Sequence, residues 1–172
     1  MLVRKLRWYL LLIPIFCLNC RAESSGLDKI SAYAGRWKIE TTHFETAFSK
    51  AGSDSTTLKN ECWRSAGFYV CDQIVNGDSK ALVIFTYDEK TGTYASNNVT
   101  ADGVSRGGGK LLITGSTWTF PWEKESEGKT VYFRVVNIFT SPDAIEYRQE
   151  FSRDKVQWTV MAKGSEKKLS SP

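Results

Sequence analysis

His43 is the only histidine in this 172-residue chain. Any imidazole that acts as a general base, activates a nucleophile or ligates haem must therefore be this one. It lies two, four and six residues after Thr41, Ile39 and Trp37, so in a strand its side chain would be on the same face as theirs and could point inward at the strand end. Nothing in the sequence places a nucleophile or a carboxylate beside it. The sequence therefore predicts no catalytic residue, and an enzyme that uses His43 is the last of three functional hypotheses.

Arg134 lies between Phe133 and Val135 in a strongly apolar segment. A guanidinium that is buried in such a segment needs an acceptor or a carboxylate as its partner. Arg134 could bind the carboxylate of a ligand, or it could be a structural cation over Trp37. With His43, it is the candidate polar contact of a ligand site.

Large aromatic side chains supply the remaining candidate site residues. They could line a cavity, and they are equally what a packed interior requires. The candidates are Trp63, Tyr94, Trp118, Trp122 and Tyr147.

Two cysteines, Cys62 and Cys71, flank a predicted tight turn at Ala66-Gly67. If that turn is a two-residue loop, the two cysteines lie directly opposite each other on a non-hydrogen-bonded pair, where side chains are closest. This register predicts a disulfide, with two buried free thiols as the alternative. Cys62 and Cys71 do not form a Cys-x-x-Cys motif, and with one histidine they are too few for a zinc site, so no metal or cofactor is predicted.

The glycine-rich segment 105–110 superficially suggests phosphate binding. Gly103 and Gly108 have the P-loop spacing, but Gly109 stands where that motif needs lysine, and no helix pattern follows. A flexible hairpin or a bulge between strands is the better interpretation.

Alternation of apolar and polar residues predicts the elements that hold these side chains. Leu27 to Ala34 has helical spacing and predicts a short helical plug. Ten short strands follow, separated by turn residues such as Asn76-Gly77, Ser141-Pro142-Asp143 and Ser152-Arg153-Asp154. The strands are expected near 37–42, 55–64, 68–76, 80–87, 93–100, 103–114, 116–122, 130–140, 144–152 and 155–163. This pattern predicts an all-β fold, an antiparallel up-and-down barrel of about ten strands.

The first 22 residues have the three parts of a secretory signal: a basic start, an apolar stretch and small residues at the cleavage positions. We expect cleavage after Ala22, with lipid attachment at Cys20 as the alternative. Residues 23–172 then form a single domain, exported to the periplasm or secreted, with no transmembrane segment after cleavage. Its ends, 23–26 and 163–172, are polar and expected to be frayed.

The basic residues of the leader account for the net positive charge. Residues 1–22 contain four basic groups and no acidic one, so residues 23–172 carry 19 basic and 19 acidic groups. A nucleic-acid-binding protein needs a clustered positive surface, and none is visible, so nucleic acid is excluded as a partner.

The opening Gly35-Arg36-Trp37, after a short helical lead-in, resembles the first strand of lipocalins and other calycins. The Cys62-Trp63 hairpin, Thr91-Gly92-Thr93-Tyr94, Arg134 and the closing Phe151-Ser152-Arg153-Asp154 resemble a bacterial family of secreted lipocalin-like domains of unknown function. The likeness covers nearly all of 27–163. It implies that Gly35 and Trp37 close the base of the barrel, and it favours the structural role for Arg134.

The preferred hypothesis is an exported lipocalin-like protein that binds a small hydrophobic or amphipathic molecule inside the barrel. The second is a non-catalytic structural or interaction module of the cell envelope, with a filled barrel and a working outer surface.

Overall fold

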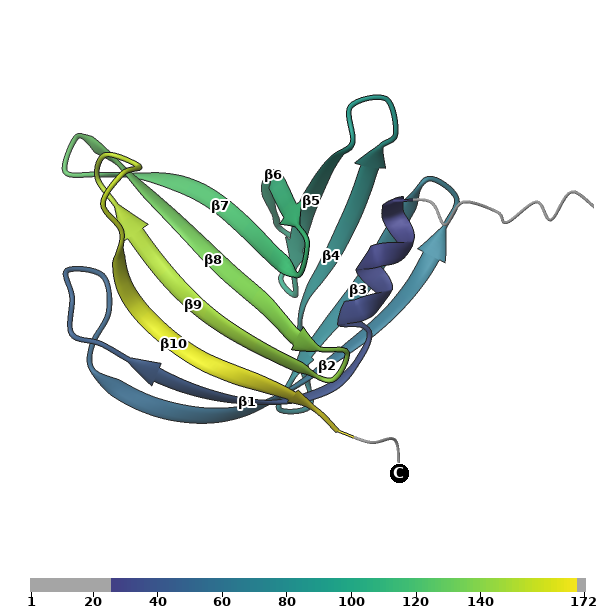
Figure 1. Cartoon of the computed structure of the whole chain (residues 1–172), viewed down its shortest axis with the longest axis horizontal. Coiled ribbons are helices and arrows are strands. Elements are labelled where there is room, and N and C mark those ends of the chain that lie inside the picture. The colour runs from purple at the N-terminus through teal and green to yellow at the C-terminus, as the bar shows by residue number, and fades with distance from the viewer. Residues whose placement is uncertain (1–25, 170–172) are drawn as a thin grey trace, which may run out of the picture.

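A computed structural model describes residues 26–169 as one closed antiparallel β-barrel in which strands follow each other in chain order and β1 pairs with β10 (Figure 1). This confirms the predicted fold class. The short helix η1 is a 3₁₀ helix, Gly26–Tyr33. The strands are β1 Gly35–His43, β2 Gly52–Ser65, β3 Phe68–Val75, β4 Asp78–Asp88, β5 Thr93–Thr100, β6 Ser105–Thr114, β7 Thr117–Ser126, β8 Lys129–Ser141, β9 Ala144–Ser152 and β10 Thr159–Lys168.

The β2–β3 hairpin has the predicted register. Ser65 pairs with Phe68 across the Ala66-Gly67 turn, and Cys62 pairs with Cys71. Ala66 adopts a positive φ of 45°, as two-residue hairpin turns require. The two cysteines form a disulfide, which confirms that prediction.

Helix η1 plugs one end of the barrel. Ile30 and Trp37 are fully buried there, and Tyr33 packs edge-on against Trp118 with ring centroids 4.9 Å apart. The indole Nε1 of Trp37 donates to the Tyr33 carbonyl oxygen at 3.0 Å. The cation over the Trp37 ring is Lys168, 4.9 Å from its centroid. The expectation that Arg134 would fill this place is therefore wrong.

A second apolar cluster lies away from the plug. Phe48, from the loop between β1 and β2, packs edge-on against Phe133 and Phe151 at 5.2 and 4.8 Å. Val131 and Met161 complete this cluster. The barrel interior therefore has two packed cores, and polar interior residues such as Thr41, Asn137 and Glu166 lie on strands that run between them.

The seam between β6 and β7 is the weakest point of the barrel wall. Only three residue pairs join these strands, from Leu112–Thr119 to Thr114–Thr117, and Figure 1 shows the rest of β6 standing apart from β7. The glycine-rich segment 105–110 forms this diverging part of β6, with a register shift opposite it at Asn97 and Val99 of β5. The segment is therefore a strand beside a bulge, and not a hairpin.

The last strand lies further along the chain than the sequence predicted: it begins at Thr159, so the expected start near residue 155 is wrong. β10 runs to Lys168, and its residues pair with β1 as far as Trp37, so the expectation that residues 163–169 fray is wrong. Closure of the barrel requires this strand, and the backbone pairing orders a segment whose side chains are mostly polar. The proposed signal peptide, its cleavage site and Cys20 lie outside the described residues.

Candidate functional site

An interior cavity of about 320 Å³, partly open to solvent, lies within the barrel. Apolar side chains from β2, β4, β7 and β8 form much of its wall: Leu58, Val83, Phe85, Phe120 and Val135. This volume is at the lower end of the range for small-molecule sites, and the mixture of apolar walls and a few polar groups is typical of them.

Two side-chain oxygens in the cavity wall have no hydrogen-bond partner. Asn60 donates its amide to the Tyr33 carbonyl oxygen at 3.1 Å, and Asn137 donates to the Tyr33 hydroxyl. The Oδ1 atoms of both asparagines are buried and unsatisfied among the described residues. A buried polar atom without a partner carries a free-energy cost of about 1–3 kcal/mol, so a ligand that donates hydrogen bonds here would recover that energy.

Glu166 of β10 also lines the cavity, as do the polar residues Gln73, Ser96 and Asn98. Glu166 is only 9 % exposed. Its partners across the sheet are Ile39 and Ile145, which are apolar. Burial among these neighbours raises the pKa of its carboxyl from 4.5 to about 7. No Lys, Arg or His of residues 26–169 lies within 4.0 Å of the carboxylate.

A lateral opening of about 1020 Å³ lies at the β6–β7 seam. It shares four wall residues with the interior cavity, Ser96, Asn98, Phe120 and Trp122. On its β6 side the wall contains Gly107, Gly108 and Gly109, which have no side chains to close the gap, between Arg106 and Lys110. The shared residues show that this opening adjoins the interior cavity.

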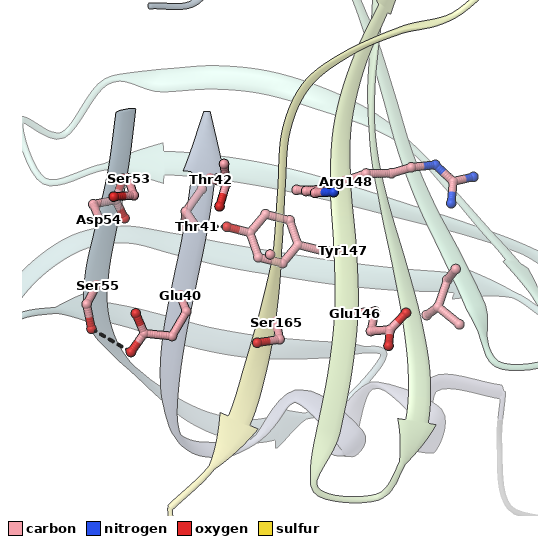
Figure 2. Close-up of a pocket in the computed structure, with 13 residues that line it drawn as sticks. Glu40, Thr41, Thr42, Ser53, Asp54, Ser55, Glu146, Tyr147, Arg148 and Ser165 are labelled. Carbon is pink, nitrogen blue, oxygen red and sulfur yellow. Dashed lines mark hydrogen bonds between the residues drawn. The ribbon is translucent and has the colours of Figure 1, made fainter. Parts of the chain in front are cut away.

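A further open groove of about 840 Å³ lies across β2, β1, β10 and β9 (Figure 2). Many of its side chains, such as Glu40 and Thr42, alternate with interior residues and therefore point outward. Its polar groups partly satisfy one another: Ser55 donates to Glu40 at 2.9 Å, and the hydroxyls of Tyr147 and Thr41 lie 2.5 Å apart. No buried unsatisfied side-chain atom of the described chain faces this groove.

The structure places Arg134 on the outside of the barrel. Its β8 neighbour Phe133 points into the second apolar cluster, so Arg134 points outward. Its Nε donates to Glu150 at 2.6 Å, Arg148 donates to the other oxygen of the same carboxylate at 2.8 Å, and Trp158 covers the guanidinium at 3.8 Å. The Arg134 guanidinium therefore has a carboxylate partner, as predicted, but this carboxylate belongs to Glu150 of β9 and not to a ligand.

His43 lies at the end of β1 and pairs with Asp54 of β2, with Nε2 and Oδ2 2.7 Å apart. Both side chains are partly exposed. Within residues 26–169, no hydroxyl or thiol hydrogen-bonds to this imidazole, and neither residue lines the interior cavity. In the same range, no cluster of three or more potential metal ligands occurs.

Of the five candidate aromatics, only Trp122 lines the interior cavity, where it stacks on Phe133 at 5.5 Å. Trp118 is packed in the core, and the Tyr94 hydroxyl donates to the Gly26 carbonyl oxygen at 2.6 Å, which fastens η1. Trp63 lies on the other face of β2 from Cys62 and is 48 % exposed. Tyr147 points across Gly164 to Thr41.

Sequence reasoning missed Asn60, Asn137 and Glu166. Polar residues in a strand are typical of a solvated face, and no motif marks these three. The one usable signal was parity: Asn60 and Asn137 alternate in phase with the interior residues Leu58 and Val135.

These features define a class: a ten-stranded up-and-down β-barrel with a helical plug and an interior cavity. Among solved structures it is similar to Rv2717c from M. tuberculosis, with 10 % identity, a TM-score of 0.51 and coverage of 86 % of this chain and 99 % of that chain. A DUF3598-family protein of unknown function from Nostoc punctiforme has 9 % identity over 84 % of this chain and 99 % of that chain, but its TM-score is only 0.22. The first likeness shows the fold alone.

No protein-family model and no curated protein matches the sequence. The barrel is consistent with the predicted lipocalin-like fold, and the narrower bacterial family stays a prediction. No helix within residues 26–169 is long and apolar enough to cross a membrane.

Proposed function

We propose that this chain is an exported binding protein that holds one small amphipathic molecule in the interior cavity. The observation that carries the proposal is the pair of buried, unsatisfied oxygens of Asn60 and Asn137 in a cavity wall that also contains several apolar side chains. The apolar part of the ligand would contact Phe85 and Val135, and its polar part would face the asparagines. The Cys62–Cys71 disulfide supports export, because such bonds persist in oxidising compartments.

The ligand would enter through the lateral opening at the β6–β7 seam. Three residue pairs hold this seam together, so a small separation of the strands there costs few hydrogen bonds. No catalytic step is part of the proposal, and His43 and Arg134 are not ligand contacts in it.

The test uses N-phenyl-1-naphthylamine, a neutral probe that fluoresces in apolar sites, with residues 23–172 produced by export. We expect one bound probe per chain. The variant Ser96→Trp, which fills the junction of cavity and opening, should weaken binding at least about tenfold. The control Thr86→Trp, at an exposed position on β4, should bind as the unaltered protein does.

Equal binding by Ser96→Trp and the unaltered protein would place the probe elsewhere and contradict the proposal. Absence of probe binding, together with equal masses in native and denatured mass spectra, would also reject it and favour the filled structural module.

A further inference from the structure

The interior cavity is lined by Gln73, Ser96 and Asn98 in its more exposed part, and by Asn60, Asn137 and Glu166 in its buried part. The three buried side chains present acceptors to the cavity. Asn60 and Asn137 use their amide hydrogens on Tyr33 and present carbonyl oxygens, and Glu166 presents a carboxyl group. Of these three residues, none is more than 9 % exposed. A ligand that carried only acceptors would leave both amide oxygens unsatisfied and would face a negative group.

Within residues 26–169, no lysine, arginine or histidine lies within 4.0 Å of this carboxylate. Arg134 and Arg148 are held by Glu150 on the outer face. Lys168, two residues from Glu166 on β10, lies over the Trp37 ring. The titratable groups that face Glu166 are the phenols of Tyr33 on η1 and Tyr147 on β9, and the Glu166 charge helps to raise the pKa of both.

We infer that the cavity selects ligands whose polar end is a positively charged hydrogen-bond donor, an ammonium or a related organic cation, which Glu166 binds together with the carbonyl oxygens of Asn60 and Asn137. This inference rests on the proposed function, since it names the ligand class of the same cavity. A buried carboxylate gains most from a partner that both neutralises and hydrogen-bonds it.

The raised pKa of Glu166 agrees with this geometry. It reflects a carboxyl that has lost water and gained no partner. A bound cation would favour the ionised form, so binding should strengthen as the pH rises through about 7. A ligand with a carboxylate would show the opposite dependence.

The experiment compares three probes with one naphthalene body: 1-naphthylmethylamine, 1-naphthalenemethanol and 1-naphthoic acid. Calorimetry with residues 23–172 should give an order of amine, then alcohol, then acid, with the amine at least about tenfold tighter than the alcohol at pH 8. Amine affinity should fall about tenfold or more at pH 5.5, where the ammonium stays charged and Glu166 becomes neutral.

The matched variants are Glu166→Gln and Glu146→Gln. Glu146 is exposed on the outer face of β9, beside β10, so its substitution should leave all three affinities unchanged. Glu166→Gln should lower amine affinity to that of the alcohol and remove the pH dependence, while alcohol affinity changes less than about threefold.

The possible outcomes distinguish failure of the cation preference from failure of the proposed binding function. Equal binding of amine and alcohol, or tighter binding of the acid, overturns the inference and leaves a ligand-binding barrel. An amine preference that survives in Glu166→Gln also overturns it. If none of the three probes binds and N-phenyl-1-naphthylamine also fails, both the inference and the proposed function are rejected.

Discussion

At the scale of single residues, the contrast between two carboxylates is informative. Glu150 and Glu166 are both buried on neighbouring strands, but Glu150 has two arginine partners and Glu166 has none among the described residues. Buried charges in proteins are normally paired. Glu150 is paired in this way on the outer face. Glu166 is not, and it faces the interior cavity, where a bound ligand could supply a positively charged partner.

Without a ligand, Glu166 should make folding stability depend on pH. Its folded-state pKa of about 7 lies above the unfolded value of 4.5, so the folded state binds the proton more tightly. Stability is therefore lost as the pH rises from 4.5 through 7, by at most about 3 kcal/mol. We expect Glu166→Gln to be more stable than the unaltered protein at pH 8, with the difference vanishing near pH 4.5.

Urea unfolding of both proteins at the two pH values measures this difference. Asp88, Asp102 and Asp154 have lowered pKa values and lose their contributions only below about pH 4, and they are common to both proteins. A difference independent of pH would contradict the assignment of a raised pKa to Glu166.

At the scale of elements, the sequence predicted most strands because alternation and turn chemistry agree along the chain. The β2–β3 hairpin is the clearest case, since one turn dipeptide determined the register of Cys62 and Cys71. Prediction failed where pairing, and not side-chain type, decides the structure. The end of β10 has little apolar alternation and is ordered by β1, so Glu166 could not be assigned to the interior.

The hairpin disulfide should contribute measurable stability. It joins cysteines nine residues apart, and a loop of this length gives about 2.6 kcal/mol on chain-entropy grounds. We expect the double variant Cys62→Ser, Cys71→Ser to lose about this amount in urea unfolding. Adding a reductant should lower the free energy of unfolding of the unaltered protein and leave that of the double variant unchanged. An equal decrease in both proteins would show that the reductant does not act through the Cys62–Cys71 disulfide.

At the scale of the whole molecule, closure joins the first strand to the last. Each of residues 164–168 of β10 pairs with a residue of β1. One of these partners is Trp37, which is buried against helix η1. The wall of the interior cavity depends in part on this closure, because Glu166 in that wall belongs to the closing strand.

Truncation tests this dependence. A chain that ends at Lys163 lacks half of β10, and we expect it to lose cooperative urea unfolding and near-ultraviolet circular dichroism. A chain that ends at Leu169 keeps all of β10 and should unfold as the full chain does. Cooperative unfolding of the shorter chain would mean that the barrel does not need its last strand.

The short β6–β7 seam has a consequence for self-association. A fully closed barrel has no free strand edges, whereas diverging strands expose backbone groups that another chain can pair with. Pro121, whose carbonyl oxygen lies near Gly109, has no amide hydrogen to offer along this edge. Gly107 has a positive φ of 81°, which interrupts the regular extended backbone of β6 on the other side. Pro121 and Gly107 therefore make this seam a poor template for a foreign strand.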